Sequence, residues 1–172
     1  MEHTASVAWA RTRRVPRAGG SCDHERMRPA DQRTLEFGPL WVLSALAGTY
    51  TRFDEFELDA FWDTVVEVAL RTPEPARAIL TATTVDRPAL LLDFGLDGRP
   101  VVSGLSHVVA LLDRMGPPVD QDYRSALLRI GASVARARGP FGRRMTENDE
   151  QKLLLLGALL EIEPEPDGML IP

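Results

Sequence analysis

The stretch "TRFDEFELDAFWDTVVEVAL", residues 51–70, carries the start and the body of a predicted helix. Asp54 is a strong N-cap residue, because its side chain can accept a hydrogen bond from a free backbone N–H of the first turn. Glu57 stands three positions later, where a carboxylate completes the capping box. Apolar residues then repeat at the spacing of one helix face, at Leu58, Phe61, Val65 and Val68.

Helical periodicity dominates the chain from residue 34 onward, and Thr34 is the expected cap of the first helix. No stretch predicts a strand of note. We therefore predict an all-α fold, with six to seven helices in a single bundle that spans residues 34–162. The polar, Arg-rich residues 1–33 are expected to be a disordered basic tail, and residues 163–172 a C-terminal tail. Met27 is a plausible alternative start, in which case residues 1–26 would not belong to the natural protein.

Composition narrows the class of protein. The 172 residues suffice for one domain, and their 44% hydrophobic and 26% charged content is typical of a globular protein. The net charge is −5: residues 1–33 hold 7 Lys/Arg against 4 Asp/Glu (+3), so the remainder holds 13 against 21 (−8). Such an acidic body disfavours nucleic acid as a partner. The single Cys22 excludes an internal disulfide, and no apolar run is long enough for a membrane span, so we expect a cytoplasmic protein.

A second acidic helix start occurs in "MTENDEQKLLLLGALL", residues 145–160. Its layout matches the first, because the cap Asp54 corresponds to Thr146 and Glu57 corresponds to Asp149. Each start follows a stretch rich in small residues, "VLSALAGTY" and "IGASVARARG". The chain thus uses one helix–loop–helix unit twice, which predicts two pseudo-repeated halves.

The acids at these starts allow two interpretations. A carboxylate in the first turn faces free N–H groups and the positive end of the helix dipole, worth roughly 0.3–1 kcal/mol, so each can serve as a helix start alone. If the two starts converge, their oxygens can share a hard divalent cation, for which calcium is the best candidate. The spacing is not that of an EF-hand loop. The candidate ligands are Asp54, Glu57, Thr146, Asp149 and Glu150.

The doubled unit resembles the tellurite-resistance protein B (TerB) family in the broad, TerB-like sense. The resemblance is carried by "LSALAGTYTRFDEFELDAFWDTV" and "ALLRIGASVARARGPFGRRMTENDEQKLLLLGALL", and it covers about residues 37–160. It implies a single all-α TerB-like bundle with two pseudo-repeated halves, and a metal site built from acids of both repeats.

The chain departs from the family pattern where the family has Asp-Gly. Thr51-Arg52 stands there in the first loop and Arg138-Gly139 in the second, followed by the insertion "PFGRR". Two expected carboxylates are thereby missing, and arginines stand nearby that can pair with the remaining ones. We therefore expect a divergent member that binds a cation only weakly.

The leading functional hypothesis is a non-enzymatic TerB-like interaction module with an unidentified protein partner. The resemblance implies a bacterial stress-response context, with tellurite resistance as the namesake. No G-x-S-x-G turn is present, and His107 has no carboxylate on its own helix face, so we interpret it as structural. Two alternatives stay open: a metal-assisted hydrolase that uses the same acids, and a pure protein scaffold with no ion.

Trp62 is the expected interface residue. It follows Phe61 directly, and neighbours on a helix diverge by 100°, so one of the two rings should point partly outward. An outward Trp62 would be a candidate anchor for a partner, because buried aromatic residues often dominate the energy of interfaces.

Overall fold

The computed structural model describes residues 27–47, 55–138 and 145–162. For residues 55–57 and for Arg138 it describes only the backbone. The described residues are all-helical and contain no strand, which confirms the predicted all-α class. The helices are α1 (Pro29–Glu36), α2 (Gly38–Ala47), α3 (Glu55–Arg71), α4 (Ala76–Val85), α5 (Arg87–Asp97), α6 (Val101–Met115), α7 (Val119–Arg138) and α8 (Glu147–Leu159). None of these helices is long and apolar enough to cross a membrane.

The expected cap at Thr34 is wrong. The hydroxyl of Thr34 lies inside α1 and donates a hydrogen bond of 3.0 Å to the carbonyl of Ala30, one turn earlier. The helix begins instead at Pro29, whose fixed φ suits the first helical position, so five residues assigned to the tail belong to α1. A second helix, α2, then begins at Gly38.

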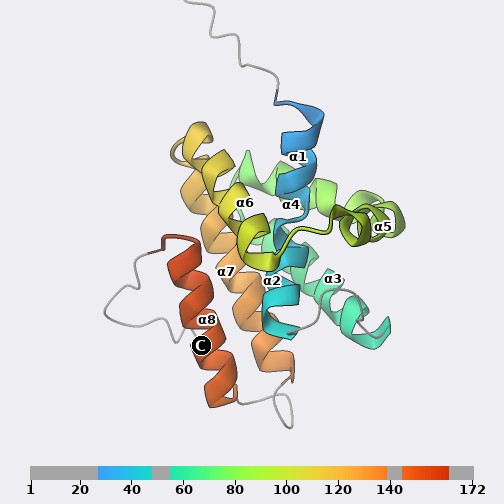
Figure 1. Ribbon diagram of the computed structural model, residues 1–172, viewed down its shortest axis with the longest axis vertical. Coiled ribbons are helices and arrows are strands. Elements are labelled where there is room, and N and C mark those ends of the chain that lie inside the picture. Colours follow the sequence, from blue (N-terminus) through green and yellow to red (C-terminus); the bar gives the residue numbers. More distant parts are fainter. Residues whose placement is uncertain (1–26, 48–54, 139–144, 163–172) are drawn as a thin grey trace, which may run out of the picture.

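The helix α2 forms the centre of the bundle, in contact with α1, α6, α7 and α8 (Figure 1). Its residues from Gly38 to Ser44 are all buried, and so is Leu46. A helix that is apolar on every side has to be surrounded by other elements, so the composition of α2 dictates its central place. The helix α5 lies at one edge of the bundle (Figure 1).

Two glycines let helices approach α2 and α7 closely. A Cβ atom at Gly104 of α6 would lie 2.3 Å from Cε2 of Trp41, so the indole ring rests directly on the α6 backbone. A Cβ atom at Gly131 of α7 would lie 2.9 Å from a methyl carbon of Leu156 on α8. The contact at Gly104 requires the absence of a side chain, because the Trp41 ring is rigid, whereas a side chain at Gly131 would require the Leu156 methyl group to shift.

Two polar side chains of α7 fasten the surrounding helices. Arg124 is buried; its Nη1 donates to the carbonyl of Leu160 at 2.8 Å, and its Nη2 pairs with Asp113 of α6. The fully buried Tyr123 hydroxyl donates to the carbonyl of Leu35 in α1. Burial raises the pKa of this phenol far above its ordinary value, so Tyr123 stays a neutral donor.

The substitution Gly104→Ala should destabilise the protein, because the new methyl group would push against the buried indole of Trp41. Overpacking of this kind costs about 1–3 kcal/mol. Urea unfolding monitored by circular dichroism measures the change. The matched control is Gly157→Ala in α8, where a Cβ atom meets nothing within 4 Å and helix propensity should add up to about 1 kcal/mol of stability. Equal effects of the two substitutions would contradict the close contact.

Candidate functional site

The acidic start of α8 has the predicted cap. The Thr146 hydroxyl oxygen accepts a hydrogen bond of 3.2 Å from the backbone N–H of Asp149. The same hydroxyl donates to the Asp149 carboxylate at 2.7 Å. Glu147 and Glu150 are exposed beside this pair. The cap at Thr146 is therefore confirmed, and one oxygen of Asp149 is already engaged in it.

The other half of the predicted cation site lies outside the described residues. Asp54 is not described, and of Glu57 the structure gives only the backbone, in the first turn of α3. Within residues 27–47, 55–138 and 145–162, no three His, Cys, Asp or Glu side chains are grouped so that they could hold a metal ion. The convergence of both acidic starts on one cation stays a prediction.

The two predicted units do lie against each other. The helices that precede the acidic starts, α2 and α7, pack together, while α3 packs on α7 and α8 packs on both α7 and α2. Lys152 adds a polar link between the units, because its Nζ donates 2.7 Å to the carbonyl of Leu46 near the end of α2. A cation is favourable there, since the end of a helix carries free carbonyls and partial negative charge.

The expected exposure of Trp62 is wrong. Trp62 is only 3% exposed and Phe61 only 1%, with their ring centroids 4.8 Å apart. The helix α3 is contacted by α4 and α7, so side chains that diverge by 100° can both be covered. Arg87, at the start of α5, places its guanidinium 5.3 Å from the Trp62 ring. Trp62 is therefore a core residue rather than an exposed anchor.

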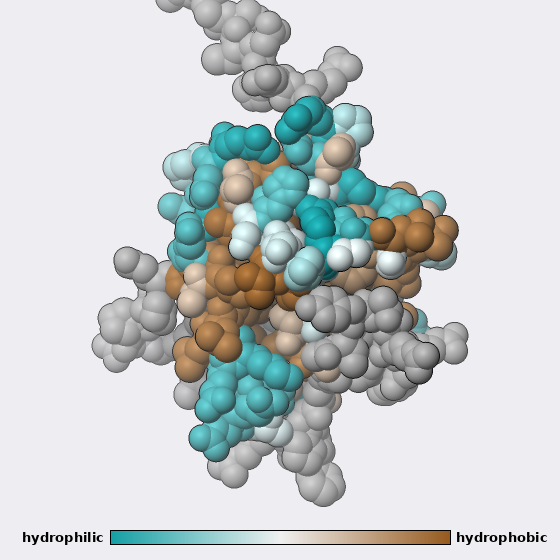
Figure 2. Space-filling model, in the orientation of Figure 1, coloured by the Kyte–Doolittle hydropathy of each residue, from teal (hydrophilic) through white to brown (hydrophobic). Residues whose placement is uncertain are grey.

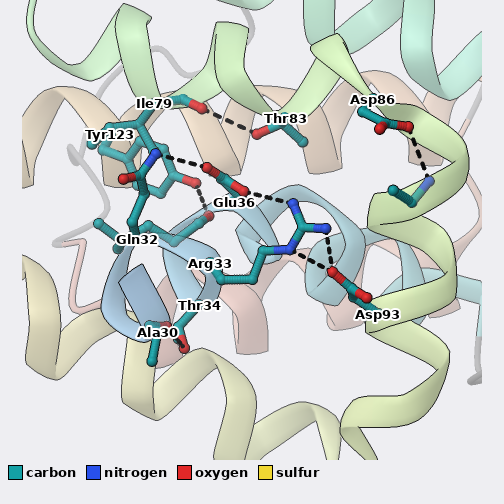
Figure 3. A network of polar contacts seen from close by, with 12 residues as sticks. Ala30, Gln32, Arg33, Thr34, Glu36, Ile79, Thr83, Asp86, Asp93 and Tyr123 are labelled. Atoms are coloured by element: carbon teal, nitrogen blue, oxygen red, sulfur yellow. Dashed lines mark hydrogen bonds and ion pairs between the residues drawn. The ribbon is translucent and has the colours of Figure 1, made fainter. Parts of the chain in front are cut away.

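A polar network fastens α5 to α1 (Figure 3). Arg33 donates to Glu36 at 2.9 Å, and its Nε donates to Asp93 of α5 at 3.0 Å. Burial by itself would lower the pKa of Arg33, but the hydrogen bonds to both carboxylates outweigh it and raise the pKa. Arg33 is thus a permanently charged link whose two partners lie on different helices.

A second arginine, Arg99, lies between α5 and α6 and contacts side chains of both helices. Arg99 donates from Nε and Nη2 to both oxygens of Asp97, each at 2.6 Å. Its Nη1 lies 2.6 Å from Nδ1 of His107, and its guanidinium lies 5.8 Å from the centroid of the Trp41 ring. The hydrogen bonds from Arg99 lower the pKa of the Asp97 carboxyl. His107 therefore serves as a partner of a structural arginine, in line with its interpretation as structural.

Large apolar side chains are exposed on several helices, and on α5 and α8 two leucines of one helix are exposed close together. On α5, Leu92 and Leu96 are 66% and 76% exposed, and Figure 2 shows hydrophobic surface where this helix lies. On α8, Leu154 and Leu155 are 70% and 66% exposed, while Leu156 is buried. Sequence periodicity missed these leucines, because runs such as "ALLLDF" and "KLLLLGALL" are apolar on all sides and do not show which side is inward.

The two apolar faces differ in charge. The carboxylates of α5 at Asp93 and Asp97 are already paired with Arg33 and Arg99. The outer face of α8 contains Glu147, Glu150, Gln151, Leu154, Leu155 and Ala158, all exposed and spaced as one side of a helix. Its two glutamates form no ion pair with another described residue, so within the described part of the chain this side combines exposed carboxylates with leucines.

Loss of the Asp97–Arg99 pair should make stability less sensitive to acid. A carboxyl whose pKa is lowered by folding contributes stability above its unfolded pKa of about 3.9, and this contribution disappears as the pH falls through the folded pKa. Asp97→Asn should therefore unfold at a lower urea concentration than the native protein at pH 7, and the gap should narrow at pH 3. Asp63→Asn, at an exposed position of α3, is the control. A gap that stays constant from pH 7 to pH 3 would contradict this role.

Comparisons with known proteins assign no family to the chain. No protein-family model, no curated protein and no solved structure matches it. The resemblance to the TerB-like family accordingly stays a prediction that rests on the two acidic helix starts and the repeated unit around them.

Proposed function

We propose that this protein is a non-enzymatic, TerB-like interaction module of a bacterial stress response, which docks a protein partner on α8. The single observation that carries the proposal is the outward orientation of Leu154 and Leu155, which are 70% and 66% exposed on consecutive positions. Contiguous apolar surface on a protein that is otherwise well packed commonly marks an interaction site.

The packing of α8 supports the proposal, because the helix is held firmly from its inner side. Leu156 fits against Gly131 of α7, Lys152 reaches the carbonyl of Leu46 and Arg124 holds the carbonyl of Leu160. A surface on a rigid helix presents its side chains to a partner at little entropic cost.

The proposal includes weak binding of a divalent cation, with calcium as the best candidate, by Asp54, Glu57, Thr146, Asp149 and Glu150. The repeated layout of the two starts and the hard oxygen ligands they offer support it. The hydrogen bond from Thr146 to Asp149 favours low affinity, because it competes with a cation for the Asp149 carboxylate.

Site-specific cross-linking should locate the partner. A photoreactive amino acid in place of Leu154 should give one discrete cross-linked product in the cells that make the protein, because a docked partner would lie directly over this side chain. The same amino acid at position 63 of α3 should give none. The product at position 154 should disappear when Leu155→Glu is added, which introduces a charge into the apolar contact. A product that survives Leu155→Glu would contradict docking on this face.

Thermal unfolding should reveal the cation. With calcium at 100 times its dissociation constant, the folded state of the full chain should gain about 2.7 kcal/mol relative to the protein in EDTA. For a domain of this size, the midpoint should rise by roughly 5–10 °C. The rise should vanish in the double variant Glu57→Ala/Asp149→Ala and persist in Asp63→Ala. Equal midpoints with calcium, magnesium, zinc and EDTA would exclude the cation and leave a scaffold that acts through its partner alone.

A further inference from the structure

The outer face of α8 has a charge pattern that selects one kind of partner, and this inference rests on the proposed function. Glu147 and Glu150 stand in the first turn, and the leucines and Ala158 follow on the same side. The only basic side chain of α8, Lys152, is half-buried and donates to the carbonyl of Leu46. The face thus carries two carboxylates at one end and leucines along its middle, and Figure 2 shows hydrophilic surface next to hydrophobic surface where α8 lies.

We propose that this face binds a basic amphipathic helix of another protein. Leucine-type side chains of such a helix, spaced i, i+3 or i+4 and i+7, would pack on Leu154, Leu155 and Ala158. Lysine or arginine residues at one end of that helix would lie over Glu147 and Glu150. An opposite charge at the rim of an interface speeds association and sets the orientation of the partner.

The length of the face limits the size of the partner segment. From Glu147 to Ala158 the chain advances eleven residues, which corresponds to about 17 Å of helix at 1.5 Å per residue. A segment of about 11 to 14 residues, three to four turns, would cover it. The basic end should lie at the start of α8, because that end of the face holds both glutamates.

The α5 face is the less suitable docking surface for a charged helix, although its leucines are equally exposed. Asp93 and Asp97 beside it are taken up by Arg33 and Arg99. A basic helix would gain no new ion pair there, and an acidic helix would meet the same carboxylates. The α5 face therefore offers a matched control with leucines but without free charge.

Fluorescence anisotropy with three labelled peptides tests the proposal on the full chain. The first is a 14-residue amphipathic helix with a leucine stripe and lysines at one end, the second replaces the lysines by glutamates, and the third is a scrambled version of the first. The basic helix should bind at least ten-fold more tightly than the other two, and raising the salt from 50 to 300 mM should weaken its binding several-fold. Similar affinities for all three peptides would overturn the proposal.

Charge reversal on α8 provides the sharper test. In EDTA, where no cation can occupy Glu150, Glu147→Lys/Glu150→Lys should abolish the preference for the basic helix and create one for the acidic helix. Leu154→Glu should weaken binding ten-fold or more, while Leu92→Glu on α5 should leave it unchanged. Circular dichroism of each variant checks that the helical fold is kept, and the two α8 variants alter only exposed side chains. An affinity for the basic helix that is unchanged by Leu154→Glu, or that is lowered equally by Leu92→Glu, would overturn the assignment to α8.

Two further outcomes separate this inference from the proposed function. A discrete cross-link at position 154, combined with peptides that bind without regard to charge, would keep the interaction function and overturn the basic partner. A native protein that sediments as a dimer, and becomes a monomer with Leu154→Glu, would show that a second copy covers the face and would also overturn the inference.

Discussion

The close packing of Trp41 against Gly104 is the contact on which the rest of the bundle depends. It brings α2 to the backbone of α6, and the edge of Phe94 from α5 meets the same indole with 4.5 Å between ring centroids. Arg99 lies over the ring from the α5–α6 connection. One aromatic side chain therefore fixes three helices at once, and α1, α7 and α8 cover the rest of the buried surface of α2.

Arginine side chains link the helices at positions where polar groups cannot be satisfied by apolar packing. Helix ends carry unpaired carbonyls and the connections between helices carry carboxylates, and leaving such groups buried without a partner costs about 1–3 kcal/mol each. Arg33, Arg99 and Arg124 satisfy them at three different junctions, α1–α5, α5–α6 and α6–α7–α8. Among the described residues these three arginines pair with Glu36, Asp93, Asp97, Asp113 and Glu161, whereas Glu147 and Glu150 form no such pair.

Local sequence signals predicted the fold where one short-range interaction decides the outcome. The cap at Thr146 depends on a side chain and an N–H three residues apart, so its prediction succeeded. Thr34 has the same chemistry, but its hydroxyl bonds one turn back because Pro29 starts the helix earlier. The burial of Trp62 depends on Arg87 and on helices distant in sequence, which no local pattern reveals. The same holds for the outward leucines, since their orientation is decided by whichever neighbours cover the opposite side.

The distinction between α5 and α8 follows from the same rule of charge satisfaction. Both helices are too apolar for an ordinary surface, and apolar area alone would select neither partner nor orientation. On α5 the adjacent carboxylates Asp93 and Asp97 are already paired with arginines of the same chain, so a partner would gain mainly the apolar contact. On α8 the hydrogen bond between Thr146 and Asp149 satisfies the cap internally, and Glu147 and Glu150 are not needed for it. The two glutamates are not needed for the cap, and Leu154 and Leu155 are not needed for the core. Together they give α8 a surface with carboxylates at one end and leucines along the middle, which can fix the orientation of a partner.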